Sequence, residues 1–165
     1  MRTPKLRLAS ALAVATAIAV ALAVPLASAK TAFNGNVCSL LSATQVAAVH
    51  APSKCTRRTT SGSGVTDNYG TWGSATGPHL SVAVQAYQST TSSAFKLAKQ
   101  YLGQLPNAKK VSGVGSLAWE SSQGKVTALN FVVGHDICNL SVTTAKPLKS
   151  LSPVIAVAKA VAAKL

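Results

Sequence analysis

Apolar and polar side chains alternate along several short segments of this chain, with a period of two residues. Residues 80–87, 126–133 and 137–143 show the alternation most clearly, and residues 69–74 and 117–121 are shorter segments that contain aromatic side chains. Successive side chains of a β-strand point to opposite faces, so this alternation predicts strands with one buried face. The pattern therefore predicts a sheet of about five strands.

Three other segments repeat their apolar residues with the period of an α-helix and carry signals for a helix start. They are residues 42–50, 92–102 and 152–165. Ser42 and Gln45 have the spacing of a capping box, and Ser92 is a suitable N-cap for the second helix. Pro153 occupies the first position of the third helix, where no amide hydrogen is needed.

In chain order the predicted elements are a helix, two strands, a helix, three strands and a helix. Short turns join consecutive strands, which favours antiparallel pairing, and we expect the helices to pack on one face of the sheet. Residues 38–165 are predicted to form a single α+β domain, preceded by a flexible leader at residues 30–37. Residues 51–66 are rich in Ser, Thr and Gly and are interpreted as an exposed loop.

The first 29 residues have the organisation of a secretory signal peptide. Arg2, Lys5 and Arg7 form a basic start, residues 8–24 carry no charge, and residues 27–29 (Ala-Ser-Ala) offer a cleavage site. An uncleaved membrane anchor is the alternative, but the apolar run is only mildly hydrophobic and the cleavage site follows it directly. We expect residues 1–29 to be removed and the protein to be secreted, with cell-wall association as one destination.

Charge is the most unusual feature of the composition. Loss of the signal peptide removes three of the 16 basic residues and leaves a formal net charge of about +10. The only acidic residues are Asp67, Glu120 and Asp136. A hydrolase that uses two carboxylates would have to draw on these three separate positions, so we predict no catalytic residues and a protein that is not an enzyme.

Two groups of basic residues are the candidate anion-binding positions. They are Lys54, Arg57 and Arg58, and the pair Lys109 and Lys110. A strong positive charge attracts anionic partners, which for an exported protein include envelope polymers. No basic helix or aromatic strand motif accompanies the charge, so we expect no specific nucleic-acid partner. The last helix lacks aromatic residues and a dense basic face, so at most peripheral membrane contact is expected.

The three cysteines allow more than one disulfide. Cys38–Cys55 would close a short loop, and Cys38–Cys138 is the alternative pairing. Neither the cysteines nor the histidines have the spacing of a zinc site, and no metal or other cofactor is predicted.

The segment Gly113-x-Gly115-x-x-Ala118 formally matches a dinucleotide fingerprint. That fingerprint requires a helix after the glycines, whereas a strand is predicted here, so we interpret the segment as a turn that requires glycine. Trp72 lies among Gly and Ser residues and is a candidate exposed aromatic side chain, whereas Trp119 alternates with Leu117 and is expected in the core.

Two short motifs resemble a known family. Residues 38–46 (CSLLSATQV) and 111–118 (VSGVGSLA) are similar to motifs of small actinobacterial cell-envelope domains of unknown function, many of them lipoproteins. This resemblance implies a secreted or envelope α+β domain with no established catalytic activity, and it assigns no ligand. The chain differs from the family in having no lipidation cysteine, in Ser116 where an aspartate is usual, and in the additional Cys138.

The leading functional hypothesis is a secreted, non-catalytic binding domain of the bacterial cell envelope, whose partner is an anionic envelope component or another secreted protein. The alternative is a small carrier or sensor domain that holds an apolar ligand between sheet and helices. An uncharacterised hydrolase is a weaker alternative. The sequence does not determine the oligomeric state.

Overall fold

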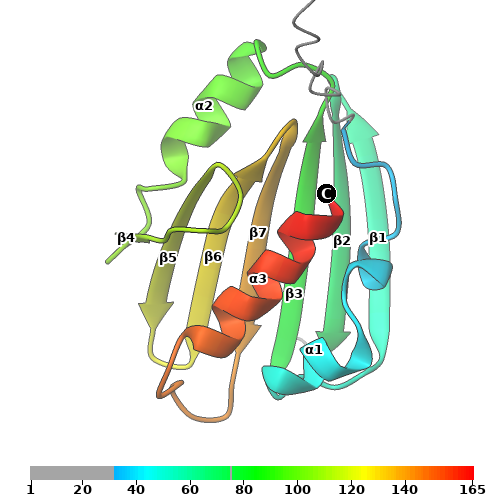
Figure 1. Ribbon diagram of the computed structural model, residues 1–165. Helices are drawn as coiled ribbons and strands as arrows, with labels where there is room; N and C mark the ends of the chain where they lie inside the picture. The colour runs from blue at the N-terminus through cyan, green and yellow to red at the C-terminus, as the bar shows by residue number, and fades with distance from the viewer. Residues whose placement is uncertain (1–31, 75) are drawn as a thin grey trace, which may run out of the picture.

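The protein folds as an α+β domain built on one antiparallel sheet (Figure 1). The computed structural model describes residues 32–74 and 76–165, so the predicted signal peptide lies outside the described residues. The strands are β1 (Cys55–Gly62), β2 (Val65–Gly73), β3 (His79–Tyr87), β4 (Lys109–Lys110), β5 (Leu117–Gln123), β6 (Val126–Val133) and β7 (Asp136–Thr143). Their order across the sheet is β1-β2-β3-β7-β6-β5-β4, which places β7 between β3 and β6.

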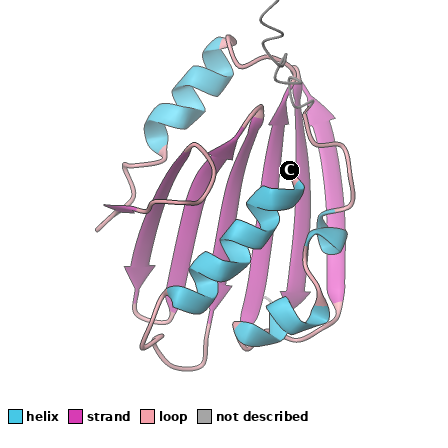
Figure 2. Ribbon diagram, viewed as in Figure 1, coloured by secondary structure: helices cyan, strands magenta, loops and turns pink. Residues whose placement is uncertain are grey.

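Within the described residues, four helical segments accompany the sheet (Figure 2). They are the 3₁₀ segment η1 (Val37–Leu40) and the helices α1 (Ala43–Ala48), α2 (Ser93–Tyr101) and α3 (Ser152–Lys164). The predicted capping box is confirmed, because the Gln45 amide donates to Ser42 Oγ and the Ser42 amide donates to Gln45 Oε1. Ser92 likewise accepts a hydrogen bond from the Phe95 amide at the start of α2.

The sheet has seven strands, not about five, because both edge strands were missed in the sequence. Residues 55–62 were interpreted as part of a loop, but they form β1, which pairs with β2 from Cys55 opposite Trp72 to Gly62 opposite Val65. Every residue of β1 after Cys55 is exposed, so no apolar alternation marks this strand. The other missed strand, β4, is only two residues long.

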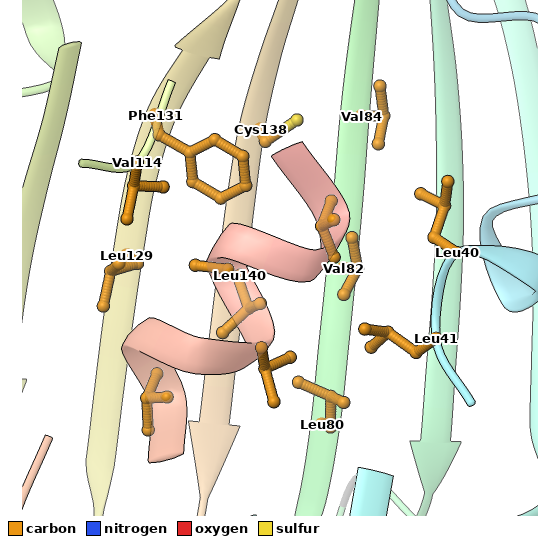
Figure 3. Packing of buried hydrophobic residues seen from close by; sticks show 14 of the residues in the cluster. Leu40, Leu41, Leu80, Val82, Val84, Val114, Leu129, Phe131, Cys138 and Leu140 are labelled. Carbon is orange, nitrogen blue, oxygen red and sulfur yellow. The ribbon is translucent and has the colours of Figure 1, made fainter. Parts of the chain in front are cut away.

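The hydrophobic core lies on one face of the sheet, which we call the helix face. In β3 this face carries Leu80, Val82 and Val84, each at most 1% exposed. Figure 1 shows α3 lying across the central strands, and Val154, Ala158 and Val161 of α3 belong to this core. Figure 3 shows the packing beneath α3, where side chains from β3, β6 and β7 meet. These side chains include Leu80, Val82, Leu129, Phe131, Cys138 and Leu140.

The opposite side of the sheet, which we call the open face, carries the other residues of the same strands. Phe95 and Leu102, at the ends of α2, pack there against Tyr87, Val132 and Ile137 in a second, smaller cluster. The rings of Tyr87 and Phe95 meet edge to face with their centroids 5.2 Å apart. The prediction that all helices pack on one face is therefore wrong for α2, which covers only one end of the open face.

The glycine-rich segment before β5 is a turn that requires glycine, as the sequence predicts. Gly113 and Gly115 have φ angles of 73° and 56°, a region that side chains with a Cβ rarely adopt. A Cβ at Gly115 would lie 2.1 Å from the Val132 carbonyl oxygen. The turn positions Val114, which is 2% exposed, in the core on the helix face.

The cysteine pairing is Cys38–Cys55, with the Cα atoms 5.9 Å apart. This disulfide joins η1 to the start of β1. Cys138 is a free, fully buried thiol in β7, so the alternative Cys38–Cys138 pairing is wrong.

The segment before η1 contacts the sheet. The Phe33 amide donates to Asp136 Oδ1 at 2.9 Å, and Asn68 Nδ2 donates to the Phe33 carbonyl at 3.5 Å. Residues 33–36 were expected in a flexible leader, and these two hydrogen bonds connect their start to β2 and β7. In the range from 32 to 165, leaving out residue 75, no helix is long and apolar enough to cross a membrane.

Burial of the Cys138 thiol, reinforced by the nearby Asp136 carboxylate, raises its pKa well above the ordinary value. Because the unfolded chain loses this proton at a lower pH than the folded chain, stability is expected to fall as the pH rises above about 8.5. Between pH 7 and 9.5 the wild type should lose up to about 1.4 kcal/mol more unfolding free energy than Cys138→Ala, as measured by urea denaturation. Equal losses in the two proteins would contradict this prediction.

Candidate binding surface on the open face of the sheet

A row of directly opposed residues crosses the open face of the sheet. Residues paired in an antiparallel register share a face, so the row can be followed from strand to strand. The row is Arg58 (β1), Tyr69 (β2), Ala83 (β3), Asn139 (β7), Asn130 (β6) and Trp119 (β5). We call these six residues the cross-strand row. Asn139 is exposed although β7 is the central strand of the sheet, so the middle of the open face is uncovered.

A groove of about 510 Å³ lies between the cross-strand row and α2. Its floor is formed by Tyr69, Ala83, Gln85, Asn130, Ile137 and Asn139, and its wall by Ala98, Tyr101, Leu102 and Leu105. Tyr101 is 56% exposed and therefore stands at the rim. The half-buried Ala83 is the smallest side chain of the cross-strand row, and it leaves the hollow between Tyr69 and Asn139.

The amide side chains in the groove are oriented by neighbours and retain hydrogen-bonding capacity. Asn139 Nδ2 donates to Asn130 Oδ1, and Gln85 Nε2 donates to Asp67 Oδ1 at 3.1 Å. Within the described residues, no buried side-chain nitrogen or oxygen lacks a partner. Asn130 lines the groove, and its Nδ2 donates no hydrogen bond to the part of the chain that the structure describes, so this atom is accessible from the groove. The groove offers this donor together with the acceptors Asn139 Oδ1 and Gln85 Oε1.

Two smaller hollows extend the groove at either side. One of about 270 Å³ is lined by Thr56, Arg57, Arg58, Tyr69 and Thr71. In it the Arg58 guanidinium carbon lies 5.2 Å from the centre of the Tyr69 ring, a cation–π distance. The other hollow, of about 380 Å³, continues from Leu105 and Pro106 along β5 and β6. Each side hollow shares one lining residue with the groove, Tyr69 in the first and Leu105 in the second.

Negative charge is nearly absent from the open face. Glu120 and Asp136 are 6% and 1% exposed and lie on the helix face, opposite Leu129 and Ala86 in their strand pairs. Asp67 is half-buried on the open face and accepts the hydrogen bond from Gln85. Burial and the charge of Asp67 raise the pKa of Tyr87, which keeps that phenol neutral. The exposed basic residues therefore dominate the electrostatic potential around the groove.

The structure separates the candidate anion-binding residues. Lys54, Arg57 and Arg58 lie at or beside the β1 edge, whereas Lys109 and Lys110 form β4 at the opposite edge. Within the first group, Arg58 points to the open face with Tyr69, and Arg57 points to the helix face, opposite Gly70. Of the first group, only Arg58 therefore has its side chain on the open face, although Arg57 also borders the side hollow near Tyr69.

The prediction that Trp72 is exposed is wrong, since its side chain is only 2% exposed. Alternation along β2 places Trp72 on the helix face, where it joins the core beside η1 and α1. Trp119, expected in the core, is half-buried on the open face and packs against the smaller cluster.

The three histidines lie in turns or at a strand end, and His135 directly precedes Asp136 in the chain. His79 and His135 contact backbone carbonyls through Nδ1, of Gly77 and Tyr87 respectively, and so lie near opposite ends of β3. His50 is exposed just after α1. Among the residues that the structure describes, no group of three His, Cys, Asp or Glu side chains could hold a metal ion.

Sequence reasoning did not select the residues that line the groove, such as Tyr69, Gln85, Asn130 and Asn139. The sequence did contain a signal for them. Gln85 and Asn139 occupy the strand positions that alternate with core positions, so their side chains face away from the core. A polar residue on the outer face of a strand is ordinarily solvated surface, so only the cross-strand register shows that these amides gather.

Comparison with known proteins gives no match, whether with protein-family models, with characterised proteins or with solved structures.

Proposed function

We propose that this chain is a secreted, non-catalytic binding domain of the bacterial cell envelope that holds its partner on the open face of the sheet. The observation that carries the proposal is Asn139, an exposed polar residue on the central strand of a seven-stranded sheet. Beside it, α2 stands over only one end of the face and forms the wall of a groove. A ligand bound there would cover the part of the open face that α2 leaves exposed.

Charge supports an anionic partner. The formal net charge is about +10 without residues 1–29, and two of the three acidic residues are buried on the helix face. Such a surface attracts polyanions over distances comparable to the Debye length. An anionic envelope component is therefore the preferred partner, and a secreted protein with an acidic surface is the other.

Export is supported by three further observations. The disulfide Cys38–Cys55 is compatible with an oxidising compartment. The first 29 residues have the pattern of a cleaved signal peptide, and the two short motifs at 38–46 and 111–118 resemble those of actinobacterial envelope domains.

Filling the hollow at Ala83 tests the proposed surface. Ala83→Gln places a longer polar side chain between Tyr69 and Asn139, and binding to a purified bacterial cell-wall preparation should fall about tenfold, measured by co-sedimentation. The matched control is Ala156→Gln, because Ala156 is exposed on α3 and lies over the helix face. Equal binding by the two variants, or no sedimentation of the wild type at low salt, would contradict the proposal.

One observation favours the carrier alternative. A separate hollow of about 450 Å³ lies beside the start of α3, lined by Pro147, Leu148 and Pro153 with Lys146 and Lys149. An apolar chain with an anionic end would fit this combination of side chains. Native mass spectrometry of the secreted protein should then show an added mass that is lost on denaturation, and a bare mass would count against a carrier.

A further inference from the structure

We infer that the ligand of the open face is an acidic polysaccharide, a chain of sugar rings that carry carboxylates, and that it lies across the strands along the cross-strand row. This inference rests on the proposed function and names the class of partner for the same surface. It follows from the shape of the groove, from the chemistry of its polar atoms and from the position of Arg58.

The groove and its two side hollows are long enough for a chain and not only for one small molecule. Neighbouring strands lie about 4.8 Å apart, so the three steps from Tyr69 through Ala83 and Asn139 to Asn130 span about 14 Å. The side hollows near Arg58 and Pro106 extend the path beyond both ends. A groove that stays open at both ends suits a segment of a polymer.

The polar atoms of the groove match sugar hydroxyl groups. Each hydroxyl donates one hydrogen bond and accepts others, and adjacent ring hydroxyls therefore need a donor and acceptors at close spacing. Asn130 Nδ2 supplies the donor, and Asn139 Oδ1 and Gln85 Oε1 supply acceptors. These amides are fixed by their hydrogen bonds within the protein, so little side-chain entropy is lost when a ligand binds.

Tyrosine rings line both sides of the same groove. Tyr69 is half-buried on the floor and Tyr101 stands on the rim of α2, so a ligand in the groove contacts both. Aromatic rings of this kind contact the apolar C–H faces of sugar rings while their hydroxyls remain free to form hydrogen bonds. Flexible linear polyanions such as polyphosphate have no ring faces to use this contact.

Arg58 supplies the charge complementarity that selects an acidic chain over a neutral one. Its guanidinium lies over Tyr69 at the end of the groove, where it can pair with a carboxylate through two parallel hydrogen bonds. The single carboxylate on this face, Asp67, is hydrogen-bonded to Gln85 in the neighbouring row. A carboxylate on a sugar next to the one at Tyr69 would therefore meet Arg58.

The test uses polygalacturonate as the probe, with the uncharged glucan dextran and with polyphosphate as comparison polymers. Arg58→Gln and Arg57→Gln change the net charge equally on the same strand. Both residues border the side hollow, but alternation along β1 turns only the Arg58 side chain to the open face, over Tyr69. We expect polygalacturonate to bind more tightly than either comparison polymer, in affinity electrophoresis or calorimetry. Arg58→Gln should weaken that binding at least about tenfold, Asn139→Ala about fivefold, and Arg57→Gln less than about twofold.

Equal losses in the two arginine variants, or polyphosphate binding as tightly as polygalacturonate, would overturn the inference and indicate attraction by net charge alone. If dextran bound as tightly as polygalacturonate, the conclusion that the polysaccharide must carry carboxylates would be overturned. If polygalacturonate does not bind while Ala83→Gln still lowers cell-wall binding about tenfold, the inference fails and the proposed function stands. If the wild type binds neither material, both fail.

Discussion

Phe131→Ala is expected to lower the free energy of unfolding by about 3–5 kcal/mol. Phe131 is fully buried in β6 and lies opposite Cys138 of β7 and Ala118 of β5 (Figure 3). The core around it combines strands, the turn around Val114 and α3, and such a closely packed frame relaxes only partly into the cavity that the substitution leaves. Urea denaturation at pH 7 measures the change.

The matched control for this substitution is Val126→Ala at the start of the same strand. Val126 is 41% exposed, so the loss there should stay near 0.5 kcal/mol, within the range of surface substitutions. A cost below about 1 kcal/mol for Phe131→Ala would mean that the core on the helix face is not packed as the structure shows.

Removal of the disulfide by the double substitution Cys38→Ala and Cys55→Ala is expected to cost about 3 kcal/mol. The bond closes a loop between positions 17 residues apart in sequence, and in the chain-entropy account its loss gives freedom back to the unfolded chain. It also joins η1 to β1, and η1 contributes Val37 and Leu40 to the core beside Trp72. Chemical denaturation of the oxidised wild type and of the double variant measures the difference between their free energies of unfolding.

A reductant separates this effect from the loss of the cysteine side chains. Dithiothreitol should destabilise the wild type and Cys138→Ala by similar amounts and leave the double variant unchanged, because Cys138 takes no part in the bond. If the double variant also responds to the reductant, the stabilising bond is not Cys38–Cys55.

The central strands were predictable because each buries one face. In β3 and β7 the core positions alternate with polar ones, and the period gives both the strand and the face that is buried. The edge strand β1 has no such signal, since its side chains after Cys55 are all exposed and its Ser and Thr residues resemble those of a loop. Strand assignment there depends on pairing with β2, which no local pattern reveals.

The position of α2 was not predictable for a related reason. Its apolar residues require a partner surface, but they do not specify which face of the sheet supplies it. A hint was present in Tyr87, an aromatic residue at an outward position of β3 that packs against Phe95. The groove depends on this placement, because its wall is α2 and its floor combines three other strands with β3. The candidate site is thus a product of tertiary arrangement, whereas the capping box and the glycine turn are local features that single segments determine.

The edge position of β1 has a consequence for self-association. Among the described residues no strand pairs with the outer side of β1. An edge of eight residues offers backbone hydrogen bonds to a second copy of the chain, which is the usual start of strand-by-strand aggregation. Here Lys54, Arg57 and Arg58 would bring like charges together whenever two such edges approach, and this repulsion opposes pairing of the edges. A polyanion that neutralises these side chains would remove the repulsion. Copies bound side by side on one polymer would then cluster more readily than copies in free solution.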